Sequence, residues 1–146
     1  MALIDDLGSG PVGIDTAVFI YFVEENPQFL PVVRPIFAAA DGGKCELVAS
    51  SLTLLEVLVV PFRTGDLQLA KQYEALLTRS RGVRLVDISR DHLRMAAQLR
   101  ATSGVATPDA LQLSAAIGSG CRGFVTNDRR LPATSGLKIF QLRDYA

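Results

Sequence analysis

The chain has 146 residues, enough for one ordinary domain with its own hydrophobic core. Hydrophobic residues make up 49% of it, which excludes an intrinsically disordered protein. Its 15 basic and 15 acidic residues cancel, so no overall electrostatic field attracts a polyanion, and any contact with nucleic acid must be local.

Short apolar runs rich in β-branched residues alternate along the chain with longer segments of helical periodicity. The strands are expected at 12–15, 45–50, 83–87, 123–126 and 137–140. The helices are expected at 16–24, 28–41, 51–62, 66–79, 90–102 and 108–119. Pro31 and Pro35 are expected to kink or split the second helix. No internal repeat, low-complexity tract or linker interrupts the pattern, which predicts a single domain over residues 1–146.

Strands that alternate with helices predict an α/β fold, a three-layer α/β/α sandwich with a mostly parallel central sheet. Such sheets place binding groups at the carboxyl ends of their strands. The N-terminus MALIDDLGSG does not resemble a secretory signal, and LTLLEVLVV is too short to span a bilayer. We therefore expect a cytoplasmic protein with no membrane partner. Cys45 and Cys121 lack a CxxC spacing and are expected to remain buried thiols.

Four carboxylates occupy positions that this fold could bring to one end of the sheet. Asp15 ends the first strand, and Asp128 follows the strand GFVT in the turn TND. Asp109 opens the helix TPDALQLSAAI, and Glu56 lies early in the apolar helix that contains LTLLEVLVV. All four could face the same edge of the sheet.

Each acid also has an ordinary structural explanation. Asp15 can cap a helix, and Asp128 suits an Asx turn. Asp109, behind a capping Thr107, stabilises the positive end of a helix dipole. Glu56 is harder to explain, because no basic residue lies three or four positions away and an unpaired buried carboxylate costs several kcal/mol. A Glu at the edge of a buried helix that reaches water remains the alternative.

A cluster of these acids requires a cation, because two unit charges about 4 Å apart repel by roughly 4 kcal/mol at an effective dielectric near 20. Oxygen-only ligands favour Mg²⁺ or Mn²⁺, and the absence of His and Cys near these positions argues against zinc. Such ions bind phosphate oxygens and activate water, which makes phosphodiester hydrolysis the natural chemistry.

The segments GIDTAVFIYF, LTLLEVLV, TPDALQLSAAI and FVTNDRRL, in this order over nearly the whole chain, resemble the PIN-domain nucleases, in particular the VapC-type toxins of toxin–antitoxin pairs. The resemblance implies a PIN-like fold and a metal-dependent endoribonuclease that hydrolyses RNA with a metal-activated water. It implies catalytic and metal-binding roles, for one or two Mg²⁺ or Mn²⁺ ions, for Asp15, Glu56, Asp109 and Asp128. It further implies supporting polar roles for Thr16, Thr126 and Asn127.

The same resemblance implies an antitoxin partner, whose tail blocks the acidic site, and a homodimer. The helical pair at 51–79, interrupted by Pro61, is expected to offer the partner an apolar groove. Arg129 and Arg130, beside Asp128, are the expected RNA-backbone contacts. Two positions depart from the family pattern: Ala17 stands where Asn is frequent, and Leu131 where an aromatic residue is common. Neither is a proposed metal ligand.

The main alternative is a non-catalytic PIN-like RNA-binding or scaffold protein. An idle cluster of carboxylates would destabilise the fold, which speaks against it. His92 is the only histidine and is expected on a helix surface, so a mechanism that needs two histidines in one subunit is excluded. The sequence has no P-loop and no GxGxxG after a strand. A receiver-like phosphoacceptor domain is a poor match, because Asp5 and Asp6 precede the first strand instead of following it.

Overall fold

The computed structural model describes residues 2–134 and 136–146. Its centre is a five-stranded sheet in the order β3-β2-β1-β4-β5, with every neighbouring pair parallel. The strands are β1 (Pro11–Ile14), β2 (Glu46–Ser50), β3 (Val83–Val86), β4 (Gly123–Thr126) and β5 (Lys138–Gln141). The predicted parallel α/β fold is confirmed, and each strand lies within one residue of its expected bounds.

Seven helices connect and cover these strands: α1 (Leu3–Leu7), α2 (Thr16–Val23), α3 (Leu30–Asp41), α4 (Leu52–Thr64), α5 (Leu67–Arg79), α6 (Arg90–Ser103) and α7 (Thr107–Gly118), counted over the residues described above. A 3₁₀ turn, Leu142–Asp144, follows β5. The six predicted helices are confirmed within two residues at each end, and α1 was not predicted.

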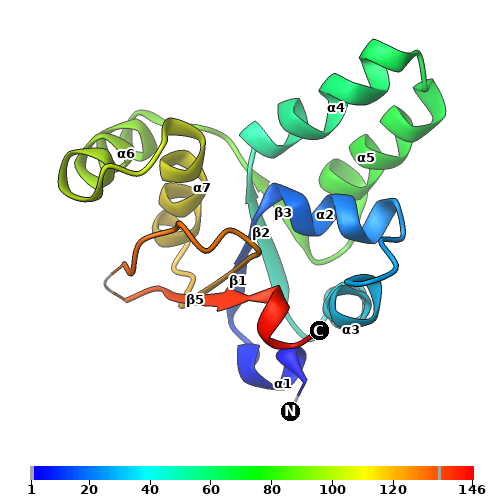
Figure 1. Cartoon of the computed structure of the whole chain (residues 1–146), viewed down its shortest axis with the longest axis horizontal. Coiled ribbons are helices and arrows are strands. Elements are labelled where there is room, and N and C mark those ends of the chain that lie inside the picture. The colour runs from blue at the N-terminus through cyan, green and yellow to red at the C-terminus, as the bar shows by residue number, and fades with distance from the viewer. Residues whose placement is uncertain (1, 135) are drawn as a thin grey trace.

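The helices form two outer layers. Figure 1 shows α6 and α7 on one side of the sheet and α2 to α5 on the other. Strand β2 shows why both sides are covered, because its side chains alternate between two apolar cores. Leu47 and Ala49 belong to the larger core with α2, α3 and α5, whereas Val48 packs in the core beneath α7.

Helix α7 lies unusually close to the central strand because Gly13 has no side chain. A Cβ on Gly13 would lie 2.6 Å from the ring of Phe124 and 2.7 Å from the Cβ of Ala116, a distance that packed carbon atoms do not reach. Gly13 therefore allows α7 to contact β1 directly. The amino end of α7, which carries Asp109, is held beside the end of β1.

Three local expectations about proline and helix ends were wrong. Helix α3 is not split: Pro31 stands in its first turn, where no intrahelical hydrogen bond is lost, and the helix continues past Pro35 to Asp41. Pro61 lies inside α4, and the break between α4 and α5 falls at Gly65, which adopts the left-handed conformation (φ 73°). The cap of α7 is Ala106 and makes no side-chain hydrogen bond, so Thr107 is the first helical residue instead of the cap.

Helix α4 is also less buried than its sequence suggested. Its inner face is buried, but Leu55, Val59, Val60 and Phe62 are exposed by 61%, 41%, 56% and 56%. Cys45 and Cys121 are free and buried, as predicted. No helix within residues 2–134 and 136–146 is long and apolar enough to cross a membrane.

Candidate functional site

The carboxyl ends of two neighbouring strands hold the first two acids. Asp15 directly follows β1, and Asp128 follows β4, which pairs with β1 in parallel. The backbone N–H of Asp15 donates to the carbonyl of Val125 across this pair at 3.0 Å. Parallel pairing therefore brings Asp15 and Asp128 to one edge of the sheet, where the sequence pattern placed them.

Thr126 connects these two acids. Its hydroxyl, fully buried, donates to Asp15 Oδ2 at 2.6 Å and accepts from the Asp128 backbone N–H at 3.0 Å. The other Asp15 oxygen caps α2 by accepting the Thr16 backbone N–H at 2.8 Å. Asp15 thus serves as a helix cap and still faces the other carboxylates. Its pKa is raised from 3.8, first by burial and then by the charges of Glu56 and Asp128.

Glu56 is joined to Asp15 through the residue between them. The Thr16 hydroxyl donates to Glu56 Oε1 at 2.6 Å, while the Thr16 backbone N–H holds Asp15. Glu56 therefore has hydroxyl and amide partners in place of the missing basic residue, since Gln112 also donates to it, at 3.3 Å. The alternative of a Glu that simply reaches water from a helix edge does not describe this arrangement.

Asp109 lies in the first turn of α7, as expected from the sequence. Its pKa is raised, first by burial and then by the charges of Asp15, Asp128 and Glu56, while Arg130 acts in the opposite direction. A carboxyl group responds to three other carboxylates only when they are near it. The charges of Asp15, Asp128 and Glu56 thus oppose ionisation of Asp109, although the four acids come from four separate segments of the chain.

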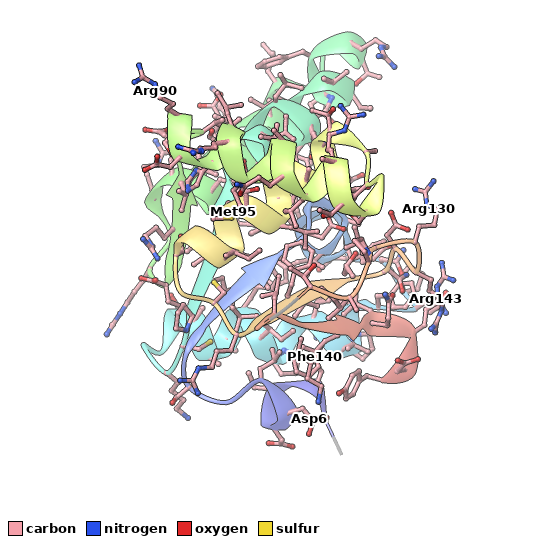
Figure 2. The ribbon with its side chains drawn as sticks, turned by 90° about the vertical axis from the view of Figure 1, so that its left-hand side faces the viewer. Asp6, Arg90, Met95, Arg130, Phe140 and Arg143 are labelled. Atoms are coloured by element: carbon pink, nitrogen blue, oxygen red, sulfur yellow. The ribbon has the colours of Figure 1, made fainter. Side chains whose placement is uncertain are left out.

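Asp128 differs from the other acids because it has a cation. Arg130 forms a two-pronged pair with it, Nε to Oδ1 at 3.0 Å and one terminal nitrogen to Oδ2 at 3.1 Å. The backbone N–H of Arg130 also donates to Oδ1 at 2.9 Å and closes an Asx turn. These contacts with Arg130 lower the pKa of Asp128. The Arg130 side chain is 89% exposed, and in Figure 2 it extends outward on the same side of the molecule as Arg143.

An open cavity of about 560 Å³ lies beside the acids. Its lining includes Asp15, Asn127, Asp128, Arg129, Arg130 and Arg143. The lining thus combines carboxylates with guanidinium groups, and guanidinium groups bind phosphate oxygens well. The Asn127 amide donates to the hydroxyl of Tyr21, which lines the same cavity, at 3.4 Å. Arg129 pairs with Asp144 at 2.9 Å.

Sequence reasoning did not find Arg143, Thr53 or Gln112. Arg143 stands in the 3₁₀ turn after β5, outside any of the motifs, and only folding brings it to the cavity. Gln112 had a detectable signal, because it is a polar residue three positions after Asp109 and therefore shares its helix face. Thr53 likewise precedes Glu56 by three residues.

The donor chemistry of the site fits a hard divalent ion. Its acids offer only oxygen, and a cation would relieve the repulsion that raises the pKa of Asp15 and Asp109. Within the described part of the chain, no three Asp, Glu, His or Cys side chains lie close enough to hold a metal ion together. Asp128 is turned toward Arg130, so a shared ion requires that carboxylate to rotate toward Asp15 and Asp109.

A family model described as "PIN domain" matches residues 12–137, a span that contains all four acids. The chain belongs to the PIN domain family. No curated protein sequence matches it significantly.

Solved structures with the same PIN fold include VapBC2 from Rickettsia felis bound to a DNA fragment from its promoter. That match has a TM-score of 0.69 at 17% identity and covers 90% of this chain and 98% of the other. A toxin-antitoxin complex from Klebsiella pneumoniae has a TM-score of 0.65 at 17% identity, with 87% and 94% covered. DNA-bound VapBC from Salmonella typhimurium has a TM-score of 0.63 at 20% identity, with 91% and 98% covered. These similarities confirm the PIN-like fold.

Proposed function

We propose that this PIN domain protein is a metal-dependent endoribonuclease and the toxin of a toxin–antitoxin pair. The observation that carries the proposal is the hydrogen-bonded arrangement at the ends of β1 and β4, where Thr126 bridges Asp15 and Asp128 and Thr16 bridges Asp15 and Glu56. It lies beside a cavity that Asp15, Asp128 and three arginines line. The toxin–antitoxin complexes with the same fold support the biological role. A cytoplasmic location and a homodimer belong to the same proposal.

The acids would hold Mg²⁺ or Mn²⁺, which when bound neutralises phosphate charge and lowers the pKa of water. The chain's own residues position this site. Thr126 fixes Asp15 relative to the Asp128 backbone, and Thr16 fixes Asp15 relative to Glu56. Because these donors are buried, the orientations of the Asp15 and Glu56 carboxylates are set before substrate arrives, whereas that of Asp128 depends on Arg130.

The direct test is cleavage of a mixed RNA substrate in Mn²⁺ and in EDTA. We expect cleavage only with the metal, and products with 5′-phosphate and 3′-hydroxyl ends, because hydrolysis by water does not use the 2′-hydroxyl of the substrate. End-labelling of the products checks this. Products with 2′,3′-cyclic phosphate ends would contradict the mechanism. A non-catalytic scaffold, the alternative function, would cleave nothing and would not need to bind Mn²⁺ at the acids.

Exchange of Arg129 and Arg130 for Gln is expected to weaken RNA binding by about tenfold at low salt, because two phosphate contacts are lost, and to lower its salt dependence. Mn²⁺ binding should survive in the double variant, since Arg130 opposes a cation at Asp128 and supplies no ligand. Filter binding and calorimetry measure the two affinities. The matched control exchanges Arg79 and Arg122, which are exposed and outside the cavity lining. Loss of Mn²⁺ binding in the Arg129 and Arg130 variant would contradict the assignment.

The antitoxin would cover the exposed apolar side chains of the α4–α5 pair. They comprise Leu55, Val59, Val60, Phe62 and Leu67. Exposed apolar side chains grouped on one helix pair are typical of a protein interaction surface. This surface is continuous through α4 with Glu56, so a partner seated on it lies within reach of the acids.

A further inference from the structure

Gln112 is a buried polar residue whose side chain leaves its own helix and reaches two others. It stands in α7, and only 3% of it is exposed. Its amide nitrogen has two protons and three acceptors within reach: the Thr53 hydroxyl at 2.8 Å, the Thr16 hydroxyl at 3.0 Å and Glu56 Oε1 at 3.3 Å. One of the two protons is therefore shared between two acceptors. One side chain therefore ties α7 to α2 and α4 directly beneath the acids.

The hydrogen bonds among Thr53, Thr16, Gln112 and Glu56 have fixed donors and acceptors, with Glu56 as the final acceptor. A carboxylate cannot donate, so the amide atom that faces Glu56 must be the nitrogen. The Thr16 hydroxyl donates its one proton to Glu56 and accepts hydrogen bonds from Gln112 and from the Thr53 hydroxyl, which lies 3.0 Å away. Thr16 and Gln112 thus both donate to Glu56 Oε1, and the Thr53 hydroxyl donates to Thr16.

The same arrangement leaves the other amide atom without a partner. Gln112 Oε1 is buried and has no hydrogen bond in the described structure. A buried acceptor without a hydrogen-bond partner destabilises the folded state, because it loses its contacts with water and gains none in return. Gln112 is therefore a poor residue for stability alone, since an apolar side chain of the same size would avoid that cost.

We propose that Gln112 is a positioning residue for the metal site: it fixes Glu56 Oε1 so that Oε2 is left to coordinate the divalent ion. The inference rests on the proposed metal-dependent function. Both hydrogen bonds that the described residues make to the Glu56 side chain fall on Oε1. Two donors on one oxygen hold the carboxylate in a single orientation, and outer partners of this kind tune metal affinity.

Gln112→Met separates this role from a purely structural one. The variant removes the unsatisfied oxygen and keeps the volume, while Thr16 still donates to Glu56 and Thr53 still contacts Thr16. We therefore expect the melting temperature in EDTA to stay equal or rise. We expect Mn²⁺ affinity to fall by about tenfold, at the lower end of the range for such partners. Gln112→Leu repeats the test with a different apolar shape.

The experiment titrates Mn²⁺ into the full chain by calorimetry, for the wild type, Gln112→Met, Glu56→Gln and the double variant. Ser114→Ala is the matched control, because Ser114 is equally buried on α7 but donates only to the Ala110 carbonyl of its own helix. If Gln112 acts through Glu56, Gln112→Met lowers affinity in the wild-type background and has little further effect beside Glu56→Gln. Ser114→Ala should leave the affinity unchanged.

Three outcomes would overturn the inference. An unchanged Mn²⁺ affinity in Gln112→Met, with normal binding by the wild type, refutes the positioning role and leaves the proposed function intact. An equal loss in both backgrounds shows that Gln112 acts independently of Glu56. A wild type that binds no Mn²⁺ refutes the proposed function, and the positioning role falls with it.

Discussion

Glu56→Gln is expected to reduce RNA cleavage by at least about 100-fold and to raise the melting temperature of the metal-free protein by about 3 °C. The carbonyl oxygen of the new amide can still accept from Thr16 and Gln112. The variant removes a negative charge that raises the pKa of both Asp15 and Asp109, which lowers the repulsion within the metal-free site. Cleavage should be lost because Glu56 is a proposed metal ligand.

With millimolar Mn²⁺ the order of stability should reverse, because the ion stabilises the native state that binds it more tightly. Melting curves of both proteins in EDTA and in Mn²⁺ measure this. Glu74→Gln is the matched control, since Glu74 is exposed on α5 and should change neither curve. A Glu56→Gln protein that melts lower in EDTA and gains as much from Mn²⁺ as the wild type would show an ordinary helix residue.

The pH dependence of the stability of the metal-free protein also reports the repulsion among the acids. Asp15 and Asp109 have native pKa values above 3.8, so the native state holds more protons than the unfolded state in that range. Their contribution to stability therefore falls as the pH rises from about 3.8 through their native pKa values. Asp128, with a lowered pKa, contributes in the opposite sense below 3.8. In the Glu56→Gln variant, the loss of stability as the pH rises above 3.8 should be smaller than in the wild type.

Expression of the chain alone in a bacterial host is expected to stop growth, and Asp109→Asn is expected to restore it. The variant removes one ligand of the proposed metal site, which lowers cleavage by about 100-fold or more. Colony counts after induction measure the effect, and co-expression of the cognate small partner protein should also relieve it. Asp91→Asn is the control, because Asp91 lies in the first turn of α6 as Asp109 does in α7.

Two results would count against the toxin role. If the protein cleaves RNA in vitro but its expression is harmless, the nuclease activity is supported and the toxin role is contradicted. Growth arrest that persists in Asp109→Asn would assign the toxicity to something other than the acids.

The main elements could be predicted because their periodicities are strong and uninterrupted, as in β2, whose side chains alternate between two cores. The missed helix α1 has five residues and no side-chain cap, so it leaves no pattern. The cap of α7 was misplaced because Pro108 is acceptable at either of the first two helical positions, and the sequence alone does not choose between Ala106 and Thr107.

The positions of the four acids followed from strand and helix ends, which chain order determines well. The hydrogen-bond and ion-pair partners of these acids could not be predicted in the same way. The pair between Asp128 and Arg130 depends on a side-chain rotation, and the contact from Gln112 to Glu56 joins residues 56 positions apart. Such contacts depend on how far one helix lies from another, and periodicity does not contain that distance.

The close contact between Gly13 of β1 and helix α7 fixes how far α7, and with it Asp109, lies from the central strand. Gly13 lies on β1, which Asp15 directly follows, and α7, which packs against it, carries Asp109 in its first turn. The missing side chain of Gly13 therefore affects the distance between these two proposed metal ligands. Coordination distances tolerate changes of only about 0.2 Å. An added methyl group would displace α7 by more than this tolerance, although it would touch neither ion nor substrate. Purifying selection on catalysis is therefore expected to act on a glycine buried one layer below the site.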